Sequence, residues 1–239
     1  MAGLAQNTSW GLILRARGDV TAEAREAMER LARSYWLPVY THVRRKTRDA
    51  ARAEDLTQEF FATFLEKGWI STVDRARGRF RTFLLVVLDR FLADQHDLER
   101  AAKRGGGRRA VPIDVELAER VAADPASGGL DPARAFTRDC ALAVIRECLD
   151  ELRQEMDEGG RPAYYEVFVR SHGFDGHAPH ETYGGLARDL AIKESDVTNY
   201  LHRARQAFRR ILEERVLQAV DSPDQVQAEI AALLEALTR

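Results

Sequence analysis

Apolar residues recur at helical spacing along most of the chain. One stripe, with alternating steps of three and one residues, predicts a long amphipathic helix that starts at Phe80; it consists of Phe80, Phe83, Leu84, Val87, Leu88, Phe91 and Leu92. A second stripe consists of Leu56, Phe60, Phe61, Phe64 and Leu65, and a third of Tyr35, Val39 and Val43. Pro38 lies within the third stripe and predicts a kink or a helix boundary there.

The second half of the chain follows the same period. A helix is predicted from near Ala133 to about Glu158, where the sequence Gly-Gly-Arg-Pro interrupts it. After Ser222-Pro223, a last helix is predicted from Asp224 to Leu237 because its apolar residues form one stripe. No convincing β alternation occurs, so the predicted fold class is all-α.

Glycine, proline and acidic residues mark a boundary between two helical domains. Three consecutive glycines end at Gly107, and residues 113–131 carry five acidic side chains against one arginine, which is typical of a flexible acidic linker. We therefore predict a domain at 1–107, a linker at 108–132, a second domain at 133–220 and a C-terminal helical extension at 221–239.

The segment from Thr182 to Arg210 has the pattern of a helix-turn-helix. A short apolar helix face ends at Leu190, and a second face contains Val197, Leu201, Ala204 and Phe208. Ser195 is the predicted N-cap of the second helix. Ala191 stands where such turns often have glycine, and alanine is costly if the turn needs positive φ. The alternative is a helical hairpin with a solvated basic face.

The outward face of that second helix carries groups suited to DNA. Short polar side chains near its start can reach base edges, and arginines can also meet phosphates. The candidate DNA-binding residues are Ser195, Asp196, Thr198, Asn199, His202, Arg203 and Arg205.

A basic loop precedes the long helix at Phe80. A positive loop beside a polar helix face suits a single strand whose bases are turned out of the stack, although a merely solvated basic face explains either feature alone. The candidates are Arg75, Arg77, Gly78, Arg79, Arg81, Arg90, Asp94 and Gln95. Upstream, the sequence AEDLTQEFF, starting at Ala53, sets acidic side chains beside an apolar stripe, which the helix dipole could also explain.

Taken together and in this order, these segments resemble the sigma-70 family of bacterial RNA polymerase sigma factors. The resemblance covers about residues 8–107 and 133–215. Within the family, the chain most resembles the extracytoplasmic-function (ECF) group, which keeps only sigma regions 2 and 4. AEDLTQEFF resembles region 2.2, and the turn followed by LHRAR (Leu201–Arg205) resembles region 4.2.

The resemblance implies a role for each segment. Region 2.2 binds the coiled-coil helices of the polymerase β′ clamp, which implicates Glu54, Asp55, Gln58 and Glu59. The loop Asp74–Arg79 and the helix after it would capture the −10 element, with Arg90 and Asp94 at places where asparagine is common. The second helix of the helix-turn-helix would bind the −35 element, and the linker would run toward the RNA-exit path.

Some features go beyond that pattern. Residues 159–180 are longer than the usual connection and contain His172, His177 and His180, but without a nearby cysteine or helical spacing we predict no metal site. The C-terminal stripe either packs on the second domain or docks a partner such as an anti-sigma factor. Thr57 and Thr63, in or beside the predicted clamp-binding helix, are candidate sites for a regulatory kinase.

Composition and charge narrow the class of protein. The chain has 45% hydrophobic and 31% charged residues, as expected for an ordinary globular protein, and no run of about 20 apolar residues that would cross a membrane. Residues 1–110 hold 21 basic and 14 acidic side chains, whereas the remainder holds 15 and 24, which hints at a polyanionic partner for the first half. The two cysteines, Cys140 and Cys148, lie too far apart on one helix to bridge, so we expect a reduced cytoplasmic protein without disulfides.

The sequence pattern favours one of three functions over the others. The first is a sigma factor without catalysis or cofactor, whose partners are core RNA polymerase and promoter DNA. The second is a stand-alone helix-turn-helix regulator with a ligand- or protein-binding N-terminal domain, which would bind its operator without polymerase. An enzyme is disfavoured because the chain has no phosphate-binding glycine loop and no paired nucleophile and base, and His42 and His96 are predicted to be surface or helix-face residues.

Overall fold

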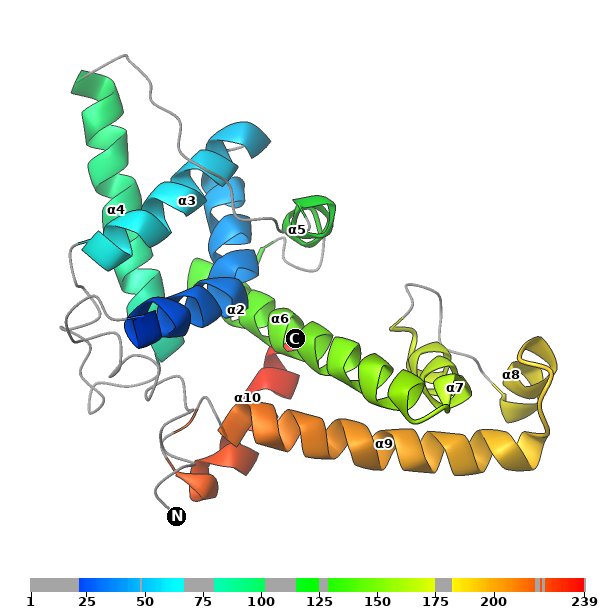
Figure 1. Cartoon of the computed structure of the whole chain (residues 1–239). Helices are drawn as coiled ribbons and strands as arrows, with labels where there is room; N and C mark the ends of the chain where they lie inside the picture. The colour runs from blue at the N-terminus through cyan, green and yellow to red at the C-terminus, as the bar shows by residue number, and fades with distance from the viewer. Residues whose placement is uncertain are drawn as a thin grey trace. The chain divides into compact units, whose positions relative to one another are not determined.

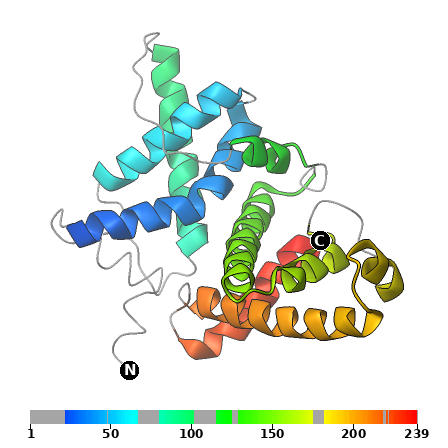
Figure 2. The same cartoon turned by 45° about the vertical axis from the view of Figure 1, so that its right-hand side comes forward.

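The computed structural model describes residues 22–47, 49–66, 80–101, 115–124, 129–174, 182–217, 220 and 222–238. Every regular element in these ranges is a helix, and they contain no strand (Figures 1 and 2). The all-α prediction is therefore confirmed. Helices predicted to start at Phe80 and to end at Glu158 do so.

The chain forms two compact units. Unit 1 takes in the described residues of Met1–Ala143 and Leu217–Arg239, and unit 2 is Val144–Val216. This division differs from the predicted domains because it falls inside one helix, α6 (Pro132–Glu158), and assigns the C-terminal segment to unit 1.

Unit 1 is built around three helices that cross one another in Figure 1: α2 (Ala22–Thr47), α3 (Ala50–Glu66) and α4 (Phe80–Ala101). Their predicted stripes meet in one core that includes Val39, Tyr40, Phe60, Phe64, Leu84, Leu88 and Phe91. The Phe60 ring makes an edge contact with Phe91, with the centroids 5.5 Å apart, and so ties α3 to α4.

Pro38 lies inside α2 and does not end it. The helix changes direction along its length (Figures 1 and 2), as expected where proline removes one N–H group from the backbone ladder. The buried Thr41 hydroxyl oxygen lies 3.0 and 3.1 Å from the carbonyl oxygens of Leu37 and Pro38. Of the two alternatives predicted for Pro38, the boundary is wrong.

Part of the predicted flexible linker is a helix packed on α2. In α5 (Val115–Ala122), Ala118 and Val121 are buried. The Glu119 carboxylate accepts a hydrogen bond from the Tyr40 hydroxyl at 2.6 Å and one from Arg44 Nε at 2.8 Å. Burial, and then the bond to Glu119, raises the pKa of Tyr40. Residues 115–122 therefore differ from the flexible segment that their acidic composition predicts.

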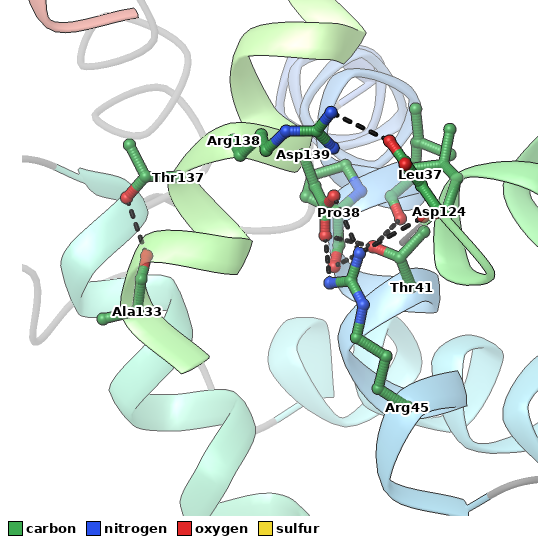
Figure 3. Close-up of polar contacts among 10 residues, drawn as sticks. Leu37, Pro38, Thr41, Arg45, Asp124, Ala133, Thr137, Arg138 and Asp139 are labelled. Atoms are coloured by element: carbon green, nitrogen blue, oxygen red, sulfur yellow. Dashed lines mark hydrogen bonds and ion pairs between the residues drawn. The ribbon is translucent and has the colours of Figure 1, made fainter. Parts of the chain in front are cut away.

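A buried polar cluster joins α2 to the start of α6 (Figure 3). Asp139 is fully buried, and its carboxylate accepts hydrogen bonds from the Thr41 hydroxyl at 2.7 Å and from Arg45 at 2.5 and 3.0 Å. Nearby, Arg138 donates to Asp124, after α5, at 2.8 Å. These bonds hold the beginning of α6 in unit 1.

Unit 2 consists of the rest of α6 with α7 (Pro162–His172), α8 (Tyr183–Asp189) and α9 (Glu194–Leu217). Its buried side chains include Leu152, Met156, Val167, Phe168, Leu186, Val197, Leu201 and Ile211. Arg215 of α9 pairs with Glu147 and Glu151 of α6 at 3.4 and 2.8 Å. Because these groups are partly exposed, the apolar contacts stabilise the unit more than the ion pairs do.

Three helices of the chain end in the same closing turn, which requires a residue with positive φ. Gly160 after α6 and Gly173 after α7 have φ of 67° and 70°. After α8 the corresponding residue is Ala191, with φ of 53°. The N–H groups of Ala191 and Ile192 donate to the carbonyl oxygens of Arg188 and Ala187, as in a Schellman motif. The turn therefore does need positive φ at the position where the sequence departs from glycine.

We expect Ala191→Gly to raise the free energy of unfolding by about 1 kcal/mol, because it removes the left-handed strain of an alanine. Urea denaturation followed by circular dichroism measures this change. Gly160→Ala is the matched control and should cost a similar amount, since no atom lies within 4 Å of the added Cβ and only the backbone strain changes. Destabilisation by Ala191→Gly would contradict the strain argument.

Candidate functional site

The predicted clamp-binding residues share one outward side of α3. Asp55 and Glu59 are exposed, Glu54 and Gln58 are half-buried, and Gln58 Nε2 donates to Glu54 at 3.3 Å. We call these four residues the α3 strip. Leu56 and Phe60 point the other way into the core of unit 1, so the helix presents acid on one side and is anchored on the other.

Thr57 is not presented on this surface. Its side chain is fully buried, and its hydroxyl donates to the Ala53 carbonyl oxygen at 2.7 Å. A kinase could not reach it in this structure, which corrects the suggestion that it is a phosphorylation site. Thr63 is half-buried.

The outward side of α4 forms a row at intervals of four residues. Thr82, Val86, Arg90 and Asp94 are all exposed, and we call them the α4 row. The structure thus brings the predicted Arg90 and Asp94 together on one side. Val86 was missed as a candidate, although it lies outside the apolar stripe and is 45% exposed. An apolar side chain between polar neighbours can pack against a base that has left the stack.

The α3 strip is linked to helix α4 by a hydrogen bond. Gln95 of α4, which is half-buried, donates through Nε2 to the exposed Glu59 carboxylate at 2.6 Å. A predicted DNA-binding residue therefore contacts a predicted clamp-binding residue.

Arg81 does not lie on the exposed row. It is only 8% exposed and forms an ion pair with Glu229 of α10 (Val226–Thr238), which follows the short 3₁₀ helix η4 (Pro223–Gln225). The prediction of a DNA-facing Arg81 thus differs from its position here.

The C-terminal stripe, expected on the second domain or on a partner, contributes Val226 and Leu233 to unit 1. Arg75, Arg77, Gly78 and Arg79 lie outside the described residues.

In unit 2, the predicted DNA-binding residues gather at the start of α9. Six of the seven are exposed and Asp196 is half-buried; the exposed six are Ser195, Thr198, Asn199, His202, Arg203 and Arg205. Helix α9 begins at Glu194, so Ser195 lies inside the first turn and is not the N-cap. Asp196 instead accepts a hydrogen bond from the Lys193 N–H at 3.4 Å, and so caps the helix from within.

The histidines have structural environments. The His172 ring packs against the Phe168 and Phe174 rings, with centroids 4.7 and 5.7 Å away, and its Nε2 lies 3.5 Å from Arg205. His177 and His180 lie outside the described residues, and no group of three potential metal ligands occurs within the described ranges.

His42 is buried, contrary to the prediction of a surface or helix-face residue, whereas His96 is exposed. The His42 ring lies 2.8 Å from the Asp89 carboxylate. Burial lowers the pKa of His42, and the bond to Asp89 opposes that shift only in part. A neutral His42 therefore donates its Nε2 proton to Asp89 and holds α2 against α4.

The cysteines are free in this structure. Cys140 and Cys148 are both buried, and burial raises the pKa of each thiol, that of Cys148 to about 12. Neither has the exposed thiolate that reactivity requires.

Comparison with known families identifies the α2–α4 part of unit 1. Residues 31–101 match the family model described as Sigma-70 region 2, and this match supports a sigma-70 family sigma factor. The matched range contains both the α3 strip and the α4 row. Sigma region 2 binds core RNA polymerase and promoter DNA. No curated protein and no solved structure matches the chain. None of the described helices is long and apolar enough to span a membrane.

Proposed function

We propose that this chain is an ECF-type sigma factor, which has no catalytic activity of its own and acts in the cytoplasm. The observation that carries the proposal is the coincidence between the Sigma-70 region 2 match and the helices whose exposed sides hold the α3 strip and the α4 row. The α3 strip binds the β′ clamp helices of core polymerase. The α4 row and the loop before α4 bind the −10 element.

Unit 2 supplies the second promoter contact in this proposal. Helices α8 and α9, joined by a short turn, act as a helix-turn-helix in which the exposed start of α9 enters the major groove of the −35 element. Two units joined by one chain then bind one promoter at two places, while polymerase supplies the chemistry. The free energy for opening the −10 element comes from capturing unstacked bases, which offsets a few kcal/mol of unstacking.

We expect Glu54→Ala/Asp55→Ala to weaken binding to core polymerase by about tenfold or more, or about 1.4 kcal/mol, because a few residues of an interface carry most of its binding energy. Co-migration with purified bacterial core enzyme measures binding, and transcription in vitro measures initiation. Asp157→Ala/Glu158→Ala is the matched control, since it removes two adjacent exposed acids from unit 2.

The outcomes separate the two candidate functions. Failure of the unaltered chain to co-migrate with core enzyme at low salt would reject the sigma factor. Sequence-specific DNA binding without polymerase would favour the stand-alone regulator. Equal losses in the two double variants would reject the α3 strip as the clamp contact.

A further inference from the structure

Arg81 is held by a carboxylate from the opposite end of the chain. It lies in the first turn of α4, its side chain is 10% exposed, and Nη1 donates to Glu229 Oε1 of α10. Glu229 is itself 9% exposed. An arginine and a glutamate are rarely buried this deeply, because removing each charge from water costs several kcal/mol before their attraction is counted.

The pairing leaves the guanidinium incompletely satisfied. The second terminal nitrogen, Nη2, is buried and meets no acceptor among the described residues. An arginine presents its donors as a planar fork that fits two oxygens of one phosphate or carboxylate, and Nη2 takes no part in the bond that Nη1 makes to Glu229. The N-terminus of a helix also favours a negative charge, and Arg81 stands in the first turn of the 22-residue α4.

Packing of α10 against this place is loose. A cavity of about 330 Å³ lies beside Arg81, between α10 and the start of α6. Its lining from α10 is small or acidic, namely Ala232, Ala236 and Glu235, and Leu234 of the same helix is 47% exposed. The cavity is open to solvent on one side, so α10 covers this part of unit 1 incompletely.

The charged side chains around Arg81 belong to different elements, so the net charge there depends on whether α10 is docked. Two of the three acids at this place, Glu229 and Glu235, belong to α10 and would leave with it. Arg81 and Arg134 belong to α4 and α6 and would stay, and so would Asp131, which lies 4.0 Å from Arg134. Uncovering the surface thus changes the net charge of these five groups from −1 to +1.

We propose that Arg81 is an anion-binding site of unit 1 for a phosphate of single-stranded nucleic acid, and that α10 occupies it in the free protein through Glu229. The Glu229 carboxylate stands where a phosphate would bind, and α10 competes with nucleic acid for Arg81. The choice of nucleic acid as the anion rests on the proposed function. The competition itself rests on the buried pair, the unsatisfied Nη2 and the cavity.

The test compares two variants with the same change of net charge. Glu229→Gln keeps the size of the side chain but gives up the ion pair, and Asp224→Asn removes an exposed acid from η4 next to the same helix. The probe is a fluorescein-labelled oligothymidine of about a dozen nucleotides, bound to the full chain and followed by fluorescence anisotropy. We expect Glu229→Gln to bind about fivefold more tightly at low salt, with a slope of log K against log salt steeper by about 0.7, the value for one added phosphate contact on a single strand. Asp224→Asn should change neither quantity measurably.

Two results would overturn the inference. The affinity gain of Glu229→Gln must disappear in Arg81→Gln/Glu229→Gln, so a gain that persists removes Arg81 as the site. An equal gain of affinity in Asp224→Asn would show that the effect comes from the net charge of the protein and not from the pair with Arg81. Thermal unfolding checks that each variant is folded.

A second measurement needs no substitution. Saturating oligothymidine should speed amide hydrogen exchange at 226–238 in the unaltered chain, because α10 is displaced. Unchanged or slower exchange there would reject the competition. Co-migration of the same variants with core polymerase is scored separately, so that a gain in oligonucleotide binding without polymerase binding would reject the proposed function and retain this inference.

Discussion

Replacing Asp139 by alanine is expected to lower the free energy of unfolding of unit 1 by about 3–5 kcal/mol, the usual cost of breaking a buried ion pair by removing one partner. The Asp139 carboxylate is fully buried and accepts three hydrogen bonds, from Thr41 and from both terminal nitrogens of Arg45 (Figure 3). Without the Asp139 carboxylate, the largely buried guanidinium of Arg45 loses the negative charge that it pairs with. Because a whole domain is marginally stable, a loss of this size can unfold unit 1 under ordinary conditions.

Tryptophan fluorescence during urea denaturation reports this change selectively. All three tryptophans of the chain, Trp10, Trp36 and Trp69, fall in the part of the sequence assigned to unit 1, and Trp36 is 4% exposed in its core. Asp131→Ala is the matched control, since Asp131 pairs with Arg134 of α6 at 4.0 Å and both side chains are more than half exposed. Partly exposed pairs contribute about 1 kcal/mol or less. Equal midpoints for the two variants would show that burial of Asp139 does not matter.

Much of the fold could be predicted because an amphipathic helix requires a periodic pattern of apolar residues in its own local sequence. The apolar stripes that begin at Phe80 and Leu56 repeat with the helical period, and both became buried faces of unit 1. Helix ends marked by glycine, as at Gly159-Gly160, were predicted for the same reason. The segment 115–122 carried a similar apolar repeat, in Val115, Ala118 and Val121, but its acidic charge concealed it.

What could not be predicted depends on contacts between distant parts of the chain. Glu229 lies 148 residues from Arg81, and no local pattern indicates that the two meet. His42 and Thr57 are polar, so the sequence alone places them outside, yet Asp89 and the Ala53 carbonyl oxygen satisfy them in the interior. The α3 strip needed no such partner to be predicted, because acids opposite an apolar stripe must face outward.

The start of α9 supports the second prediction of large effect. We expect Arg203→Ala to weaken binding of the polymerase holoenzyme to promoter DNA by about 1–3 kcal/mol if Arg203 contacts a base, or about fivefold to 150-fold. Arg203 is exposed and makes no ion pair within the described residues, so its loss should leave the stability of unit 2 nearly unchanged. Arg205 is less suitable for this test because it lies beside His172.

Two comparisons separate base recognition from attraction to phosphate. Arg203→Lys keeps the charge but loses the planar fork of the guanidinium. Its affinity for promoter DNA should therefore stay near that of the unaltered chain if Arg203 contacts a phosphate, and should fall if Arg203 contacts a base through two hydrogen bonds. Arg153→Ala removes an exposed arginine from α6, where it lies over the Tyr165 ring, and controls for the charge of unit 2. Filter binding or anisotropy on promoters that differ only in the −35 element measures the effect. If Arg203→Ala and Arg153→Ala weaken all promoters equally, α9 attracts DNA through charge alone, and the assignment of −35 recognition to it is wrong.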